Sequence, residues 1–515
     1  MPTYLSPGVY VEEAPGGPRP IEAVGTSVAA FVGFAEKGPL HTASLVTNWS
    51  QYTETFGDFV EGSYLAHAVY GYFANGGGIA YVVRVGDSGG DGGAAEARPK
   101  EITGGTPVAL GSFKVSTRPG TEGDITVEVA DPAGDNPAGD RFTLLVRQGG
   151  KQVESFDVSA KKGVKNYVVT QVRERSAFVL VEEAGTPARP EKQTVALAPA
   201  LPAPGTVDAL PAVISPQEYI GAADNRTGFA SLEAIDEITM LAVPDLMSAY
   251  QRGLIDAEGV KAVQSAMITH CELMGDRLAV IDPLPEMTPR QVKEWRMEGA
   301  GYDSKYAALY YPWIKVFDPS TGQNRFMPPS GHMLGVWARN DAERGVHKAP
   351  ANEVVRGAVE LQTNVTKGEQ DLLNPIGVNC IRVFPGRGIR VWGARTLSSD
   401  PAWKYINVRR LFNYIEESVL LGTQWVVFEP NDSFLWSTIR RNISAFLSEE
   451  WRQGALFGAT ASEAFYVKCD AETNPPASIE LGRVVCEIGI CPVKPAEFVV
   501  FRLAQFSDST SLVNE

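Results

Sequence analysis

The segment Glu497–Phe506 carries apolar side chains on both faces of the β-strand that it would form. One face would hold Phe498, Val500, Ala504 and Phe506, and the other Val499, Phe501 and Leu503. An apolar strand left uncovered is an aggregation hazard, so the fold must provide a cover for it. We therefore predict that this strand pairs outside the core of its own subunit.

A second extended segment lies near the other end of the sequence. Val9, Tyr10 and Val11 form a short strand-like run between two clusters of proline and glycine, which favour an extended arm over a packed domain. We predict that this run and residues 498–503 form subunit junctions by adding strands to neighbouring chains. Head-to-tail contacts of this kind propagate into helical tubes.

The pattern between the two ends is typical of a multidomain α/β (α+β) protein with a mixed sheet. Ser27–Phe34 is a buried-strand run, Ser63–Ala74 has helical spacing of its apolar residues, and Ile79–Val85 returns as a strand. Residues 91–210 contain no Trp, Cys, His or Met, although the chain has nine Trp and nine Met. Short alternating runs between turns predict a small all-β domain there, inserted into a host domain.

We divide the chain into six predicted segments. The host is a core domain built from an early and a late part of the sequence, with a middle α/β domain between them. The segments are an N-terminal arm (1–22), the first part of the core domain (23–90), the inserted outer β domain (91–210), the middle domain (211–377), the second part of the core domain (378–492) and a C-terminal arm strand (493–515).

The second part of the core domain has the clearest helical patterns. Ile406–Leu421 keeps its apolar residues on one stripe, with Gly422 as the predicted C-cap. A second helix is predicted to begin near Asp432, a good N-cap residue, and to end at Gln453. Trp425–Phe428, between these helices, is predicted to be a strand.

Charge and cysteine content exclude several classes of protein. Lys and Arg total 46 against 61 Asp and Glu, so the net charge of −15 opposes nucleic-acid binding. The five cysteines are odd in number and form no CxxC pair, which favours a reducing compartment over a disulfide framework. A secretory signal is not evident, and no apolar run reaches the roughly 20 residues of a membrane span.

Catalytic and metal-binding motifs are weak throughout. The adjacent pair His270-Cys271 points in two directions on a predicted helix, and Gly386-Arg387-Gly388 precedes a strand where a phosphate cradle needs a helix. Glu416-Glu417 and Glu449-Glu450 are sequence neighbours on helices, an arrangement that favours solvated or interface charges over an acid/base couple. We predict a protein that is not an enzyme and that carries no metal or cofactor.

Two alternatives remain open on the residues alone. One is a cytosolic α/β enzyme with an inserted β domain, which would form a small closed oligomer and contain a polar pocket. The other is a surface-recognition module that acts through segment 91–210.

Several segments together resemble the tail-sheath family of contractile phages and phage-like injection particles. They are Ser6–Glu12, Phe56-Gly57, Phe73–Gly77, Tyr81–Arg84, Tyr306–Trp313, Pro328–Ser330, Arg344–Asn352, Asn374–Asn379, Gly388–Thr396, Tyr405–Arg410, Phe428–Asn431 and Pro495–Val499. Their order and spread over residues 1–85 and 210–510 make the resemblance specific, and segment 91–210 does not carry it.

The resemblance implies a structural role. Sheath subunits of this family stack as hexameric rings around an inner tube, exchange terminal strands with neighbours, and contract to drive the tube through a target membrane. Implied partners are further copies of the chain, the inner tube protein, and the baseplate and tail terminator proteins. Assembly in the bacterial cytoplasm is implied, without nucleic acid or membrane insertion. The two late helices would face the tube, and their candidate contact charges are Arg409, Arg410, Arg440, Arg441, Glu449 and Glu450.

Overall fold

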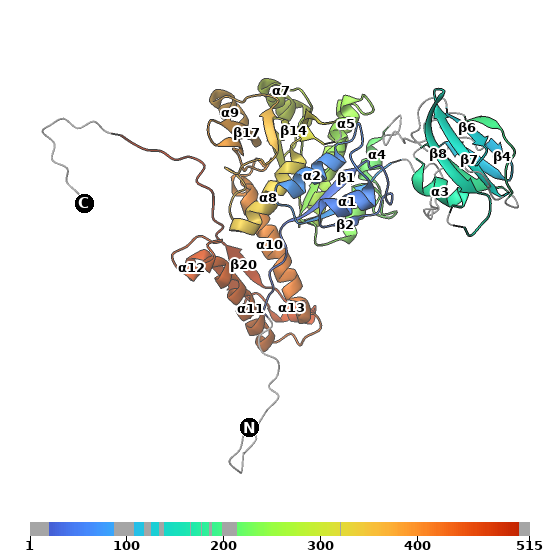
Figure 1. The fold of residues 1–515 in the computed structure, drawn as a ribbon. Coiled ribbons are helices and arrows are strands. Elements are labelled where there is room, and N and C mark those ends of the chain that lie inside the picture. The colour runs from blue at the N-terminus through green and yellow to red at the C-terminus, as the bar shows by residue number, and fades with distance from the viewer. Residues whose placement is uncertain are drawn as a thin grey trace, which may run out of the picture. The chain divides into compact units, whose positions relative to one another are not determined.

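The computed structural model describes residues 20–86, 108–117, 125–132, 139–164, 166–176, 178–184, 188–197, 214–319 and 321–503 (Figure 1). The chain divides into two compact units. One consists of Met1–Ser88 and Ala209–Glu515, and the other is Gly89–Asp208. The smaller unit corresponds to the segment that the composition of the sequence marks as an insertion.

An eight-stranded mixed sheet forms the centre of the larger unit. Its strands, in spatial order, are β18 (Gly388–Val391), β17 (Val378–Phe384), β13 (Ala307–Tyr311), β12 (Leu278–Ile281), β11 (Met240–Ala242), β1 (Val28–Gly33), β3 (Ile79–Arg84) and β2 (Ser44–Val46). The six inner strands run parallel, and the two edge strands pair antiparallel. Central strands such as β1 and β13 are buried along their whole length, as continuous apolar runs predict.

This sheet contains the early strands predicted from the sequence together with strands of the predicted middle segment. Strands from 28–84, 240–311 and 378–391 belong to one sheet over one hydrophobic core. Parallel strands pair across long helical crossovers, and the apolar period along the chain does not encode which strand will be the neighbour. Residues 211–377 are therefore part of the same body as the core segments on either side.

Helices cover the sheet and pack closely on one another (Figure 1). A Cβ on Gly331 would lie 2.5 Å from the Ala68 Cα, so α8 and α2 touch backbone to backbone there. The helices around the sheet are α1 (Trp49–Phe56), α2 (Leu65–Ala74), α4 (Pro216–Ile220), α5 (Asp245–Gln251), α6 (Ala257–Met274), α7 (Pro289–Glu294), α8 (Ser330–Arg344) and α9 (Lys367–Leu373). A small sheet of β14 (Ile314–Asp318), β15 (Gln323–Met327) and β16 (Ala358–Leu361) accompanies them.

A second hydrophobic cluster holds the late helices together. It packs α10 (Ile406–Gly422), α11 (Ser433–Arg452), α12 (Ala461–Ala464) and α13 (Pro476–Glu480) with the two-stranded sheet β19 (Phe465–Lys468) and β20 (Glu487–Ile490). The Asp432 side chain accepts a hydrogen bond from the Leu435 N–H at 2.8 Å, which confirms the predicted N-cap of α11.

Two predictions about this region are wrong: the C-cap of the first helix and the strand between the two helices. Gly422 is the last residue of α10, and Thr423 is its C-cap. Trp425–Phe428 is not a strand, because Gln424–Val426 is a 3-10 turn and Phe428 has a φ of 70°. This connection is too short and too sharply bent to reach a sheet, although its residue types favour strands. No helix in the described part of the chain is both long and apolar enough to cross a bilayer.

The smaller unit has its own hydrophobic core between two antiparallel sheets. The first sheet contains β10 (Thr194–Leu197), β6 (Ile125–Ala130), β7 (Arg141–Gln148) and β8 (Lys151–Ser159), and the second contains β4 (Val108–Leu110), β5 (Phe113–Thr117) and β9 (Val179–Glu183). The alternating burial of β6 and β7 confirms the predicted strands. One helix, α3 (Val168–Arg175), was not predicted, because its β-branched residues favour a strand by type.

Candidate functional site

The segment after β20 leaves the core and exposes its apolar side chains. Exposed fractions are 72% for Phe498, 68% for Val499, 78% for Val500, 85% for Phe501 and 98% for Leu503. Residues 493–503 form no strand in this single chain, and 504–506 lie outside the described residues. Within the described residues the predicted strand has no neighbouring strand, and a strand needs such a neighbour to hydrogen-bond with.

A carboxylate clamp fixes the point from which this segment departs. The Glu497 carboxylate accepts two hydrogen bonds from the Arg395 guanidinium, at 2.8 and 2.7 Å. The Asn374 side-chain N–H donates to it at 2.8 Å, and the Tyr405 hydroxyl donates at 3.0 Å. Bidentate pairing with arginine fixes orientation as well as distance. The clamp therefore sets the direction in which Phe498 and the residues after it emerge.

Electrostatics keep the clamp ionised. Partial burial raises the pKa of Glu497, but hydrogen bonds from Arg395 and Asn374, together with the positive charge of Arg395, outweigh it and hold the pKa at about 2. The Lys404 ammonium lies 3.5 Å from the same carboxylate.

Residues 21–26, near the other end of the described chain, are held by helix α10. Ile21 packs in the cluster beneath α10, where a Cβ on Gly422 would meet it at 2.7 Å. The Val24 N–H donates to the Ser418 Oγ at 3.3 Å. The Thr26 carbonyl accepts from the Arg410 guanidinium at 2.8 Å. Val9, Tyr10 and Val11 lie outside the described residues.

Helix α10 thus carries both anchors. Its N-cap Tyr405 reaches the Glu497 clamp, and the Asn407 side chain donates to the Val493 carbonyl at 3.1 Å. Its other end holds residues 21–24. Residues 21–26 and the segment that begins at 493 are therefore both fixed to α10.

The six candidate contact charges separate into two groups. Arg409, Arg410 and Glu450 are buried, whereas Arg440, Arg441 and Glu449 are exposed on α11. Arg410 pairs with Asp341 at 2.6 Å, and the Tyr414 hydroxyl donates to Glu450 at 2.8 Å. The Arg409 guanidinium stacks over Trp403, 4.5 Å from the ring centroid. The three buried charges are thus engaged within their own chain.

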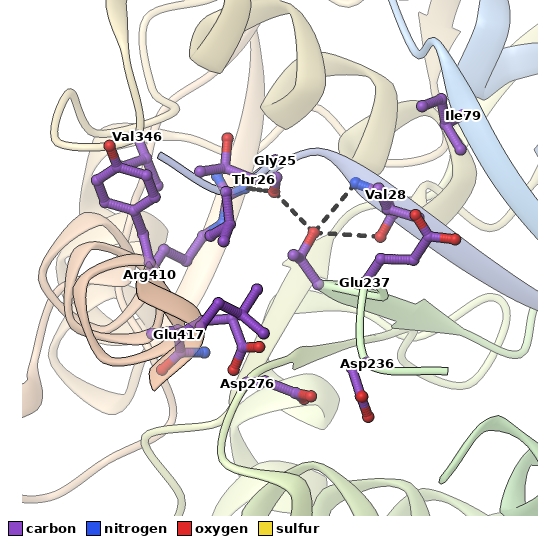
Figure 2. Close-up of a pocket in the computed structure, with 15 residues that line it drawn as sticks. Gly25, Thr26, Val28, Ile79, Asp236, Glu237, Asp276, Val346, Arg410 and Glu417 are labelled. Atoms are coloured by element: carbon purple, nitrogen blue, oxygen red, sulfur yellow. Dashed lines mark hydrogen bonds between the residues drawn. The ribbon is translucent and has the colours of Figure 1, made fainter. Parts of the chain in front are cut away.

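A cavity of about 380 Å³ lies beside the Arg410 anchor (Figure 2). Its apolar lining includes Val28 and Ile79, and four carboxylates surround it, from Asp236, Glu237, Asp276 and Glu417. Burial, and then the negative charges of Asp276 and Asp236, raise the pKa of Glu417. No cluster of three or more His, Cys, Asp or Glu side chains in the described residues is arranged to hold a metal ion.

The weak catalytic and phosphate-binding motifs of the sequence lie in a buried helix and in a turn. His270 and Cys271 are buried in α6, where burial and the Arg277 charge lower the pKa of His270 to about 4. Gly386 and Gly388 have φ angles of 72° and 78° and form the turn between β17 and β18. Sequence reasoning missed the buried pair His67–Asp318, at 3.1 Å, because its members lie far apart in the sequence.

Comparisons with known proteins agree with this architecture. Residues 214–397 match the model of the phage tail sheath protein central domain, and 398–506 match that of the phage tail sheath C-terminal domain. A prophage major tail sheath protein of Pseudomonas aeruginosa is 28% identical over 55% of this chain and 70% of its own length. The tail sheath protein of Vibrio phage KVP40 is 26% identical over 41% of this chain, and that match spans 31% of the phage protein.

Solved structures share the whole fold. The anti-feeding prophage helical sheath in its contracted state aligns with 98% of this chain and 100% of its own, with a TM-score of 0.60 at 24% identity. The sheath of the extracellular contractile injection system PVC, also contracted, aligns with 98% of this chain and 99% of its own, with a TM-score of 0.57 at 23% identity.

An eight-stranded body with an anchored, exposed apolar segment defines a structural subunit that is made to assemble. The chain belongs to the phage tail sheath family and is a structural subunit of a contractile sheath. It is accordingly a component of a phage tail or phage-like particle.

Proposed function

We propose that this protein polymerises as stacked hexameric rings around an inner tube, and that contraction of the sheath drives the tube through a target membrane. The observation that carries the proposal is the exposed apolar segment 498–503, which begins directly after the Glu497 clamp. A single subunit leaves this surface in water, so burial against a neighbour is strongly favourable. Assembly proceeds without catalysis or cofactor.

Strand addition is the mode of contact that we infer. Among the described residues, the sheet β19–β20 has two strands of four residues and therefore two outer edges. A two-stranded sheet is marginally stable by itself, and strands added at its edges would satisfy its free backbone groups. We assign residues 498–503 of one neighbour and Val9–Val11 of another to these edges.

Contact with the inner tube falls to α11 in this proposal. Arg440, Arg441 and Glu449 are the exposed members of the charge set predicted from the sequence. The sheath would meet a baseplate at one end and a tail terminator at the other, and would assemble in the bacterial cytoplasm. The solved relatives include a sheath and a baseplate assembly, which supports further copies of the chain and a baseplate as partners.

The decisive experiment truncates the chain after Glu497, so that the clamp stays intact. Full-length protein, expressed with a tube protein, should give long hollow tubes in negative-stain electron microscopy. The truncated protein should give dispersed subunits with an unchanged melting temperature, because the removed side chains that the structure describes are exposed. Tubes formed equally well by the truncated protein would contradict the proposal.

A matched pair of point variants tests the apolar character of the segment. Phe501→Ser should reduce tube length at least tenfold, because Phe501 offers the aromatic surface that a neighbour would bury. Arg502→Ser, next to it and also exposed, is the control and should assemble like the wild type.

A further inference from the structure

Cys469 and Cys486 face each other where the β19–β20 sheet opens. Lys468 pairs with Glu487 in the antiparallel register, and the next residues outward are the two cysteines. Opposite residues of an antiparallel pair have Cα atoms roughly 4.5–5.5 Å apart and side chains on the same face. A disulfide accepts Cα separations of about 4.4–6.8 Å. We propose that Cys469 and Cys486 form a reversible intrachain disulfide when the protein meets an oxidant.

The surroundings hold both cysteines in place before any bond forms. Cys469 is fully buried and Cys486 is half-buried, and each thiol is among the groups that shift the pKa of the other. The Asn474 side-chain N–H donates to the Val485 carbonyl at 3.0 Å, and its oxygen accepts from the Val485 N–H at 2.7 Å. The same Asn474 nitrogen lies 3.9 Å from the Cys469 Sγ. Asn474 therefore fixes the residue before Cys486 against Cys469.

The chemistry needs an electron acceptor, and a small-molecule disulfide such as oxidised glutathione is sufficient. The Cys486 thiolate, which is the more accessible, attacks one sulfur of the acceptor, forms a mixed disulfide and releases one small thiolate. The Cys469 thiolate then attacks the Cys486 sulfur, forms the intrachain bond and releases the second small thiolate. Two protein thiols are oxidised, one acceptor disulfide is reduced to two thiols, and the protons pass to water and the leaving thiolates.

Burial and nearby charges set the rate of this exchange. Burial raises the pKa of both thiols, that of Cys486 to about 12. The Arg440 charge acts against this rise, while Asp470 beside Cys469 and Glu487 beside Cys486 reinforce it. The thiolate is the nucleophile. While the pH is below the thiol pKa, the rate should therefore increase about tenfold for each unit by which the pH is raised. The pair would stay reduced in a reducing compartment and oxidise slowly outside it.

The bond would close the loop between the two strands. Residues 470–485, which include α13, would be tied at both ends, so the open end of the two-stranded sheet could no longer separate. This inference rests on the strand register and stands whether or not the sheet receives strands from a neighbour. Peptide mapping tests the disulfide, whereas electron microscopy of tubes tests the sheath role.

The experiment uses the full chain with Cys491→Ser, which removes an exposed competing thiol. The reduced protein is incubated with oxidised glutathione at mildly alkaline pH, alkylated and cleaved with trypsin. Cleavage after Lys468 and Arg483 places Cys469 on peptide 469–483 and Cys486 on peptide 484–502. We expect these peptides to be recovered linked, and to separate on reduction. Recovery of both as separately alkylated peptides, or of Cys486 carrying only glutathione, would overturn the proposal.

Two controls make the result specific. Equal amounts of labelled and unlabelled protein are oxidised together, and linked peptides of mixed label would mean a bond between chains and overturn the proposal. Cys486→Ser in the same background keeps the size of a half-buried residue and removes the bond. Oxidation should raise the melting temperature of the parent protein and leave that of Cys486→Ser unchanged. A melting temperature that rises equally in both would contradict the role of this pair.

Discussion

Glu497 marks the residue at which the chain changes from core to exposed segment. Its carboxylate is bound by residues from three separate parts of the chain, Asn374, Arg395 and Tyr405. The sequence pattern predicts Glu497 only as the first residue of a strand. The clamp could not be predicted, because the residues that bind Glu497 are more than 90 positions away from it and have no common spacing.

The clamp predicts a specific pH dependence. The pKa of Glu497 falls from a model-peptide value of 4.5 in the unfolded chain to about 2 in the folded one. A lowered folded-state pKa contributes stability above about pH 4.5, and this contribution is lost as the pH falls towards 2. Allowing for screening at a partly exposed site, the contribution is about 1–2 kcal/mol.

Glu497→Gln should remove this contribution at neutral pH, because a neutral amide cannot replace the ion pair with Arg395. The protection factors of the amides in residues 493–497 against hydrogen exchange should fall about tenfold, and the loss of protection that the wild type shows as the pH falls below 5 should disappear. Glu480→Gln, at an exposed position, is the matched control. Unchanged exchange in Glu497→Gln would mean that the clamp does not hold the segment.

Helix α10 shows what helical periodicity can and cannot predict. The spacing of Val408, Leu411 and Ile415 correctly predicts a buried stripe. The burial of Arg409 and Arg410 was not predicted, because α10 lies between two hydrophobic clusters and is covered on more than one face. Cation–π contacts with Trp403 and Trp337 let both guanidinium groups occupy that interior.

Gly422→Ala tests how α10 holds the segment before β1. The added Cβ would lie 2.7 Å from Ile21, so the Ile21 side chain must move. We expect faster hydrogen exchange at residues 21–26, although alanine favours the helix by about 1 kcal/mol. Gly368→Ala in α9 meets nothing within 4 Å and should leave this exchange unchanged. Equal exchange in the two variants would contradict the anchor.

At the scale of the molecule, composition predicts the insertion well and the sheet poorly. Residues 91–210 differ from the rest in residue types, and the smaller unit spans 89–208. The eight-stranded sheet joins strands as far apart as β2 and β18, and its order depends on pairing between helical crossovers. A single sequence carries no direct record of that order.

Because the smaller unit has a separate core, its removal should be tolerated. Replacing residues 89–208 by a short Gly/Ser linker should leave the melting temperature of the larger unit within a few degrees and preserve tube assembly. The excised unit should unfold cooperatively by itself in circular dichroism. Loss of tubes from a folded deletion variant would show that the insertion takes part in assembly and not only in surface recognition.

The attachment of residues 21–26 and 493–497 to α10 has a mechanical consequence. With 17 residues at about 1.5 Å each, the helix spans about 25 Å. A tensile force that enters at residues 21–24 and leaves at 493–497 has a path along this helix, because Ser418 bonds the first segment and Asn407 bonds the second. Helix α10 therefore connects the two points of attachment directly.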